Sequence, residues 1–485
     1  MNSGSHTPLL FILGIMLCGL SAMMLLPAIA DASASNPDWQ AFVGSASITL
    51  FVAMGLLLTS GSDKPFTLDV RHAFLLTAGI WIALCVFSAL PFLLFNRDLG
   101  FANAVFESVS GLTTTGSTIM VNLDAMPPGI LLWRSMLQWV GGIGIIVTAM
   151  MMLPLLRVGG MQLFRTESSD RSDKVVPRAA QLAAYIAIVY GALTVACAVA
   201  YLLGGMSPFD AVNHAMTTVS TGGYSTHDAS FGFFEETSMD MIGTVFMILG
   251  GLPFVIYIRA IKGDPAALWR ESQVQAFLAF LVVAIVIVAV GLHVQNDEGF
   301  LRALRRAAFN IISIVTTTGY ANEDYTAWGP FAIACFLLFT FIGGCTGSTA
   351  GGIKIYRFEV LWLICLQQLQ GLTSPNSVQP LSYNGRRLPG EVLSSVLAFL
   401  FVYGASVILL TVALAAFGLD LVTALSGAAT ALGNVGPGLG PVIGPAGNFY
   451  SLPDGAKLLL AAGMLLGRLE LFTILVLFQR SFWKW

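Results

Sequence analysis

A run of glycines and small polar residues, GGCTGSTAGGIK at 343–354, interrupts an apolar stretch late in the chain. Glycines followed by a lysine could cradle a phosphate, but a phosphate loop needs Gly-Lys-Ser/Thr without a gap. Here Ile353 separates Gly352 from Lys354. The run is also too rich in glycine to stay helical, although small residues can equally serve close helix packing. We therefore expect a loop that breaks a membrane helix, formed by Gly343, Gly344, Cys345, Thr346, Gly347, Ser348, Thr349, Ala350, Gly351 and Gly352.

Four polar segments point to a second kind of chemistry, the binding of a bare cation. They read FESVSGLTTTGST (106–118), HAMTTVSTGGYST (214–226), NIISIVTTTGY (310–320) and ATALGNVGPGLG (429–440). Each runs into a glycine, at 116, 222, 319 and 436, with intervals of 106, 97 and 117 residues. Carbonyls beside such glycines can replace the water shell of a cation. The predicted cation-binding residues are Thr114, Thr115, Gly116, Ser220, Thr221, Gly222, Thr317, Thr318, Gly319, Asn434, Val435 and Gly436.

The residues of enzyme catalysis are present but scattered. The five histidines are dispersed, and the six cysteines occur singly rather than at metal-ligand spacing. Neither a nucleophile elbow, nor a His-Glu-x-x-His helix, nor a dinucleotide fingerprint occurs. We expect no enzymatic activity, no cofactor in this chain and no nucleic-acid partner.

The amino-acid composition indicates whether the protein is surrounded by water or by lipid. Of 485 residues, 56% are hydrophobic and 10% are charged, and the mean hydropathy is +0.81. An ordinary soluble domain has about 25% charged residues. Uncharged stretches long enough to cross a bilayer recur along the chain. We predict an all-α integral membrane protein with ten transmembrane helices, at 7–30, 41–60, 73–95, 135–156, 179–206, 241–258, 272–295, 326–353, 392–418 and 455–478.

The four glycine segments lie between successive spans, which predicts a fourfold repeat. Each unit has a span, a half-helix, a glycine loop and a second span. About 12 residues of helix reach roughly 18 Å, to mid-membrane but not across it. A re-entrant loop is stable there only if it lines a cavity or packs on protein. The predicted division is 1–68 for two extra N-terminal helices, then repeats at 69–176, 177–268, 269–385 (with the glycine-rich break) and 386–485.

Lysine and arginine are unevenly distributed between the loops on the two sides of these spans. Short loops rich in these residues stay in the cytoplasm. The bias predicts that both termini are cytoplasmic, with a strongly basic inner loop at 157–178. A cluster at Arg302, Arg305 and Arg306 is the local exception on the outer side.

Charged residues at membrane depth are costly, and each therefore needs an explanation. Arg468 interrupts the last span, two positions before Glu470, a spacing that puts them on different faces of a helix. We expect Glu470 to pair with a neighbouring helix. We expect Arg468 to lie below the fourth glycine and to anchor the glycine-rich break by bonding its carbonyls. Carboxylates near half-helix starts, Glu107, Asp210 and Asp420, are interpreted as helix caps, and His214 as a packing residue.

Taken together, these motifs resemble the Trk/Ktr/HKT potassium transporters, and among them the bacterial TrkH type. The resemblance rests on the four glycine loops, the two extra N-terminal spans, GGMQLFRTESSD at 159–170 and GGCTGSTAGGIK. It covers essentially the whole chain. It implies K⁺ as the transported ion, a filter at the four glycines, and an intramembrane gate at 343–352 near Arg468.

The same resemblance implies partners and a location. These are a homodimer in the lipid bilayer of the bacterial inner membrane and a cytosolic, TrkA-type, nucleotide-binding regulatory subunit. In relatives that favour sodium the first filter glycine is a serine, so Gly116 implies a preference for K⁺. The fourth loop departs most from the family pattern, with Asn434-Val435-Gly436 in place of Thr-Thr-Gly.

Two other functional classes remain open at this point. An ion-coupled solute symporter can also be built from broken helices that bind at the membrane midplane, but such folds usually have twofold repeats. A non-conducting scaffold would not need four cation-binding loops. Potassium-dependent flux without an organic substrate would separate these classes.

Overall fold

The computed structural model describes residues 7–60, 70–156, 175–234, 236–296, 298–374, 381–384 and 386–483. These residues are mostly helical, with one pair of two-residue strands. The segment 159–170 and the basic residues Arg157, Arg165, Arg171 and Lys174, which the sequence singled out, lie outside the described residues.

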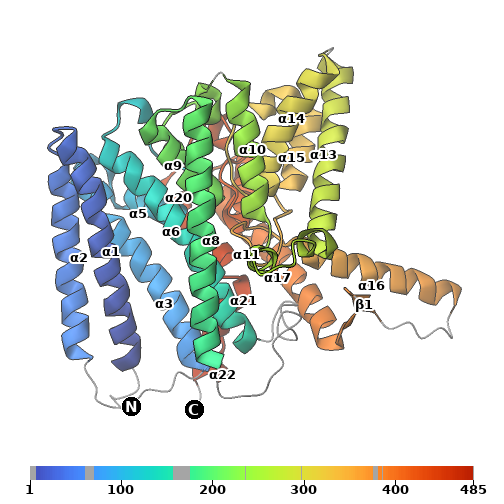
Figure 1. The fold of residues 1–485 in the computed structure, drawn as a ribbon, viewed down its shortest axis with the longest axis horizontal. Coiled ribbons are helices and arrows are strands. Elements are labelled where there is room, and N and C mark those ends of the chain that lie inside the picture. Colours follow the sequence, from blue (N-terminus) through green and yellow to red (C-terminus); the bar gives the residue numbers. More distant parts are fainter. Residues whose placement is uncertain are drawn as a thin grey trace.

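Two long helices stand at one edge of the bundle. They are α1 (Thr7–Ser33) and α2 (Trp39–Thr59), and they pack along each other (Figure 1). The Ser21 hydroxyl of α1 donates to the Ala46 carbonyl of α2 at 2.8 Å. These are the two N-terminal helices that the sequence placed outside the repeats.

The remaining helices follow the predicted order of span, half-helix, loop and span four times. The first spans are α3 (Val70–Ser88, continued by α4, Leu90–Phe95), α8 (Val175–Gly204), α13 (Ser272–Asn296) and α17 (Gly390–Ala416). The half-helices are α5 (Phe101–Leu112), α9 (Pro208–Val219), α14 (Phe300–Val315) and α18 (Leu421–Gly433). With 12 to 16 residues each, the half-helices are too short to cross a bilayer.

The second span is continuous in the first repeat and broken in the other three. It is α6 (Pro128–Leu156) in the first repeat. In the second, α10 (Thr237–Gly251) and α11 (Phe254–Ile261) meet at 91°. In the fourth, α20 (Asp454–Arg468) turns by 107° into α21 (Leu471–Leu475) and the short η6 (Val476–Phe478).

The third repeat is interrupted most. Its second span begins as α15 (Pro330–Phe339), loses helical structure, and resumes as α16 (Ile355–Thr373). The sequence expectation of a span over 326–353 was therefore wrong in extent, because the helix ends where the glycine-rich run begins. In the described residues, seven helices are long and apolar enough to cross a membrane, or nine if each bent pair counts as one span.

Helix α16 projects sideways from the bundle (Figure 1). It is followed by the antiparallel pair β1 (Ser382–Tyr383) and β2 (Arg386–Arg387). The remaining short elements connect the longer ones. They are η1 (Arg97–Leu99), η2 (Leu123–Ala125), η4 (Ser230–Phe233), α12 (Ala267–Arg270), η5 (Tyr325–Trp328), α19 (Gly440–Ile443) and α22 (Arg480–Trp483).

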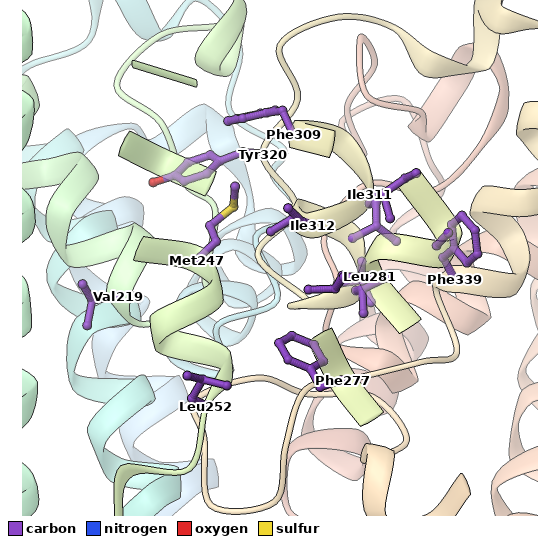
Figure 2. Close-up of a cluster of buried hydrophobic side chains, with 14 of the residues drawn as sticks. Val219, Met247, Leu252, Phe277, Leu281, Phe309, Ile311, Ile312, Tyr320 and Phe339 are labelled. Atoms are coloured by element: carbon purple, nitrogen blue, oxygen red, sulfur yellow. The ribbon is translucent and has the colours of Figure 1, made fainter. Parts of the chain in front are cut away.

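Apolar side chains from neighbouring repeats fill the space around the half-helices. Figure 2 shows one such cluster, in which α9, α10, α13, α14 and α15 each contribute. Val219 and Leu252 lie at helix ends in this cluster, and Phe277 and Phe339 pack from the outer helices. The half-helices are thus packed against protein on their sides, and the carbonyls at their C-terminal ends lie in the interior of the bundle.

Candidate functional site

All four half-helices end in the same backbone conformation, which forms four glycine loops (113–116, 220–223, 316–319 and 433–436). One residue in each loop is left-handed although it is not glycine. These residues are Thr114 (φ 53°), Thr221 (φ 50°), Thr317 (φ 57°) and Asn434 (φ 53°). A left-handed non-glycine residue is uncommon and costs free energy. The recurrence of this strain in all four repeats indicates that the four loops share a task.

A glycine with positive φ follows two residues later in each loop. These are Gly116 (84°), Gly223 (77°), Gly319 (83°) and Gly436 (113°). The second loop therefore differs from the sequence expectation by one residue. The structural counterpart of Gly116 is Gly223, whereas Gly222 occupies the position of Thr115. Two adjacent glycines made the register ambiguous in the sequence.

The four glycines close a ring. A Cβ added to any of them would lie within 2.8 Å of a carbonyl oxygen in the next loop, so only glycine fits. The contacts follow one another around the ring, from the first loop to the second, third and fourth, and back to the first. The contacts are Gly116 to the Gly222 carbonyl, Gly223 to Thr318, Gly319 to Val435, and Gly436 to Thr115.

A serine or threonine in each half-helix fixes the loop that follows. Its carbonyl accepts a hydrogen bond from the loop amide five residues later, at 2.8 to 3.0 Å. Sequence reasoning missed these residues, although each lies six positions before a ring glycine. They are Ser110, Thr217, Ser313 and Thr430.

Side chains from outside the loops add further support. Gln138 of α6 donates to the Gly222 carbonyl at 2.6 Å and accepts from the Tyr224 amide at 3.0 Å. Ser117 donates to the Gly436 carbonyl at 2.7 Å and so joins the first loop to the fourth. Neither residue was singled out from the sequence. Both hold carbonyl positions around the ring.

The arrangement can bind a cation. Carbonyl oxygens of four loops converge, and the half-helices direct their C-terminal ends toward the loops. Each helix end carries about half a negative charge, so the four together carry roughly two. Among the described residues, no group of three or more His, Cys, Asp or Glu side chains could hold a metal ion. A cation held in this ring would be bound by backbone carbonyls and hydroxyls, ligands that suit a weakly held, partly dehydrated ion.

Glu107 lies behind the first loop and is not a helix cap. It sits in the second half of α5, fully buried, and forms an ion pair with Arg134 of α6 at 2.8 Å. Its carboxylate also accepts from the Thr118 hydroxyl and the Ile119 amide. The cap interpretation was wrong because the helix begins six residues earlier, at Phe101.

Arg134 extends this network to the second loop. Its guanidinium donates to the Ser225 carbonyl at 2.9 Å and lies 4.1 Å from the centre of the Tyr224 ring. The Tyr224 hydroxyl donates to the Glu107 carbonyl at 3.0 Å. The chain segments that leave the first and second loops are thus tied to one buried ion pair.

Of the other two predicted caps, Asp420 is present, whereas the cap of α9 is Ser207, whose hydroxyl accepts from the Asp210 amide. Asp420 accepts from the Val422 and Thr423 amides at the start of α18, and hydrogen bonds from Thr423 hold the pKa of this exposed carboxyl below its usual range. Asp210 lies in the first turn of α9, where it accepts from the hydroxyls of Ser207 and Thr226. Both carboxylates also suit the positive end of a helix dipole.

Two histidines lie beside the second loop. His214, which the sequence analysis treated as a packing residue, is buried in α9 and hydrogen-bonds the Ser225 hydroxyl at 3.0 Å. His227 pairs with Asp124 of η2, and this hydrogen bond lowers the pKa of Asp124. Together they hold the segment that follows the second loop against the first repeat.

The basic cluster of the third repeat is paired with acids. Arg306 forms ion pairs with Glu298 and Glu323, and Arg302 pairs with Glu298 at 3.1 Å. Arg305 donates to the Thr237 hydroxyl at 2.7 Å. The positive charges near the start of α14 are therefore largely offset locally.

The glycine-rich run 343–352, which we name the interrupting loop, packs on the side of the ring where the half-helices end. The Gly351 amide donates to the Thr317 hydroxyl at 2.6 Å, and the Gly352 amide donates to the Gly433 carbonyl at 2.8 Å. The Thr349 hydroxyl donates toward the Gly250 carbonyl at 2.9 Å. The loop thereby contacts the third and fourth glycine loops and the break in the second repeat.

Arg468 fixes the interrupting loop from the fourth repeat. It is the last residue of α20 and is 3% exposed. Its guanidinium donates to the Thr349 carbonyl at 2.9 Å and to the Gly141 carbonyl of α6 at 3.3 Å. The predicted bond from Arg468 to a carbonyl of the interrupting loop is therefore present, and Arg468 also joins this loop to the first repeat.

A small cavity lies against the interrupting loop and carries several charged groups. Lys354, Arg357, Arg468 and Glu470 line it, together with residues of the loop. Lys354 donates to the Ala350 carbonyl. Glu470 pairs with Arg357 of α16 at 2.5 Å, as expected for an acid that pairs with a neighbouring helix. Glu470 also has a positive φ of 55° at the bend between α20 and α21.

Comparison with known proteins identifies the family. Residues 39–484 match the family model TrkH, described as a cation transport protein. The chain is 46% identical over 478 residues to the Trk system potassium uptake protein TrkI of Halomonas elongata, covering 98% of this chain and 97% of that one. It is 37% identical to TrkH of Salmonella typhimurium, with 98% of each covered.

A solved structure agrees with the sequence comparisons. The crystal structure of the potassium transporter TrkH from Vibrio parahaemolyticus superposes with a TM-score of 0.91 at 34% identity, covering 99% of this chain and 100% of that one. The likeness extends over both the repeats and the two N-terminal helices. The chain therefore belongs to the TrkH family of cation transport proteins.

Proposed function

We propose that this chain carries potassium ions into the cell, with the ring of four glycine loops as its selectivity filter. The observation that supports this most is the closure of the ring, in which each glycine faces a carbonyl of the next loop. Four equivalent loops around one axis provide the coordination that a dehydrated cation needs. The relatives TrkI and TrkH are potassium uptake proteins by name. All four ring positions are glycine, which favours K⁺ over Na⁺.

The interrupting loop is proposed to be the gate. It bonds to residues at the ends of the third and fourth half-helices, and Arg468 holds it in place. A fixed guanidinium on this side of the ring opposes the passage of another cation. Opening would require the loop to leave these hydrogen bonds, and glycines in it permit the change of backbone conformation.

The proposed setting is the inner membrane of a bacterium, with both termini in the cytoplasm. A homodimer and a cytosolic, nucleotide-binding regulatory subunit of the TrkA type complete the proposal. The start of α1 and the short α22 lie at the same end of the bundle, which agrees with termini on one side (Figure 1).

A solute symporter is the less favoured reading. Its binding site would lie between two repeats related by a twofold axis. Here all four repeats contribute to one ring.

Rubidium tracer flux into liposomes that contain the purified protein tests the proposal. We expect uptake that excess K⁺ suppresses and Na⁺ suppresses poorly. The Gly116→Ser variant adds a side chain where ring carbonyls lie, so Na⁺ should compete more effectively. Absence of rubidium flux in folded wild-type protein, or an unchanged ion preference in Gly116→Ser, would overturn the assignment. Parallel runs with a sodium or pH gradient would reveal coupling.

A further inference from the structure

The left-handed residues of the four glycine loops occupy equivalent backbone positions but have different hydrogen-bond partners. The Thr317 hydroxyl accepts from the Gly351 amide at 2.6 Å. The Thr221 hydroxyl donates to its neighbour, the Ser220 carbonyl, at 2.8 Å and also bonds a side chain of the interrupting loop, the Thr349 hydroxyl, at 3.2 Å. Asn434 donates to the Met464 carbonyl at 2.9 Å. The Thr114 hydroxyl is buried without a hydrogen-bond partner among the described residues. The repeat thus supplies four equal positions, of which the third is bonded directly to an amide of the interrupting loop.

We propose that Thr317 is a positioning residue that joins the filter to the gate. Through its hydroxyl, the third glycine loop holds the interrupting loop in its closed place. This inference rests on the proposed function, since it takes the ring as the filter and the interrupting loop as the gate.

The neighbouring contacts show how closely this bond holds the interrupting loop. Gly351 and Gly352 donate consecutive amides to Thr317 and to the Gly433 carbonyl, so the loop is wedged between two adjacent half-helix ends. A Cβ on Gly351 would lie 2.4 Å from the Gly433 carbonyl, so the fit is close. Thr317 itself is 1% exposed. Of the two acceptors only the Thr317 hydroxyl belongs to a side chain, and it alone can be removed without touching the backbone.

Thr317→Val removes the acceptor and keeps the shape of the side chain. Its effect on the closed state follows from the unpaired Gly351 amide that it leaves behind. Thr114→Val is the matched control, because the backbone is left-handed at both positions and any strain from the β-branched valine is shared. Only the bond to the interrupting loop differs between the two sites.

Rubidium flux through the purified full-length chain in liposomes, without a regulatory partner, measures the effect. For Thr317→Val we expect the initial rate to rise by about fivefold or more, the shift in a two-state equilibrium expected from one lost hydrogen bond. Thr317→Ser keeps a hydroxyl and should restore the wild-type rate. Thr114→Val alters the first glycine loop but no bond to the interrupting loop, so its rate should not rise above that of wild type. The preference for K⁺ over Na⁺ should persist in Thr317→Val, because the ring carbonyls are unchanged.

A double-variant test separates gating from loss of structure. A protein that lacks residues 345–350 keeps Gly351 but has lost the loop that the Thr317 bond would hold closed, so Thr317→Val should add nothing further. If Thr317→Val does not fold, Thr317→Ala removes the same acceptor and serves in its place. An equal rise in Thr114→Val, a loss of K⁺ preference, an additive effect in the deletion, or an unchanged rate would each overturn the inference. If wild-type protein still shows selective flux, each of these outcomes would overturn the role of Thr317 but not the proposed function. Absence of flux in wild-type protein would overturn both the role of Thr317 and the proposed function.

Discussion

At the scale of single residues, the ring depends on backbone geometry more than on side-chain chemistry. The strained residues of the loops are threonines or asparagine, and the ring glycines are fixed by carbonyls that leave no space for a Cβ. Conformational strain of this kind persists only where the surrounding structure enforces it. Here the strained conformation is enforced by hydrogen bonds that loop amides donate to half-helix carbonyls, those of Ser110, Thr217, Ser313 and Thr430.

Gly223 is expected to tolerate substitution less well than Gly222. A Cβ at Gly223 would lie 1.9 Å from the Thr318 carbonyl and would also occupy a positive-φ position. At Gly222 the nearest atoms belong to the Gln138 side chain, which can shift. Gly223→Ala should therefore abolish selective rubidium flux, and Gly222→Ala should only reduce it.

A control separates the effect of the ring from that of backbone strain. Gly418 has a similar φ of +89°, but nothing lies within 4 Å of its added Cβ. Gly418→Ala should keep its flux. If Gly222→Ala is the more damaging of the two loop variants, the register assigned to the second loop is incorrect.

Arg468 should lower the rate of ion flux. Its two bonds join the interrupting loop to α6, so Arg468→Ala frees the loop and removes a fixed positive charge. Flux should rise in Arg468→Ala and change less in Arg468→Lys, which keeps the charge but loses the planar fork. Rubidium flux in protein of matched thermal stability measures this. A lower flux in stable Arg468→Ala would mean that the arginine holds the pathway open.

At the scale of elements, the second spans differ among the four repeats. Only α6 of the first repeat is continuous, whereas the corresponding spans of the other three are broken. The breaks meet at the interrupting loop, since Cys345 and Thr349 bond the end of α10 and Arg468 ends α20. Pseudo-symmetry is thus kept in the ring and lost beneath it, where one loop alone takes the gating role that we propose.

The pair of Glu107 and Arg134 should be essential for stability. Arg134→Met leaves a fully buried carboxylate without its partner, which should cost about 3–5 kcal/mol of unfolding free energy. Adding Glu107→Gln removes that charge and should restore much of the loss. Thermal unfolding of the detergent-solubilised variants measures both. Equal destabilisation in the single and double variants would show that packing, rather than the unpaired charge, determines the loss.

Shortening the interrupting loop should open the pathway. Deletion of 345–350 removes Thr349, whose carbonyl bonds Arg468, and most of the loop's contacts with α10. Flux should rise and depend less on a regulatory partner. A well-folded deletion protein with unchanged or abolished flux would count against a gate at this place.

At the scale of the whole molecule, the chain is an all-α, multi-pass membrane protein and not an enzyme, as the sequence predicted. The apolar side chains that remain exposed on the outer helices, such as Phe51, Leu203 and Phe401, suit a lipid environment. The buried charges Glu107, Arg134 and Arg468 lie instead beside the ring and the interrupting loop.

The basic segment 157–178 is predicted to contact the regulatory subunit. Of its five basic residues, only Arg178 lies within the described residues, in α8. Charge reversal at Arg165 and Arg171 together should weaken copurification of a TrkA-type subunit while membrane insertion is retained. Unaltered copurification would limit this segment to setting the membrane orientation.

Much of the architecture follows from the sequence alone, because membrane spans and half-helices are local. Their length and apolarity are written in contiguous residues, and lipid permits few alternatives. The sequence predicted the four half-helices, the break at 343–352 and the pairing of Glu470 with a neighbouring helix. Even the register of the second loop had a local signal. A Ser or Thr precedes Gly116, Gly223, Gly319 and Gly436 by six positions, whereas Met216 precedes Gly222 by six.

Other features depended on contacts between distant parts of the chain, which only the tertiary structure decided. Glu107 looks like a cap in the sequence, and its partner Arg134 becomes evident only when α5 packs on α6. Gln138 carries no motif, and the motif that contains Thr317 does not reveal its bond to Gly351, because each residue acts on a backbone atom more than 30 residues away. The ring itself is closed by carbonyls from all four repeats. A sequence specifies each loop separately, but the space that excludes a Cβ exists only once the four loops are assembled.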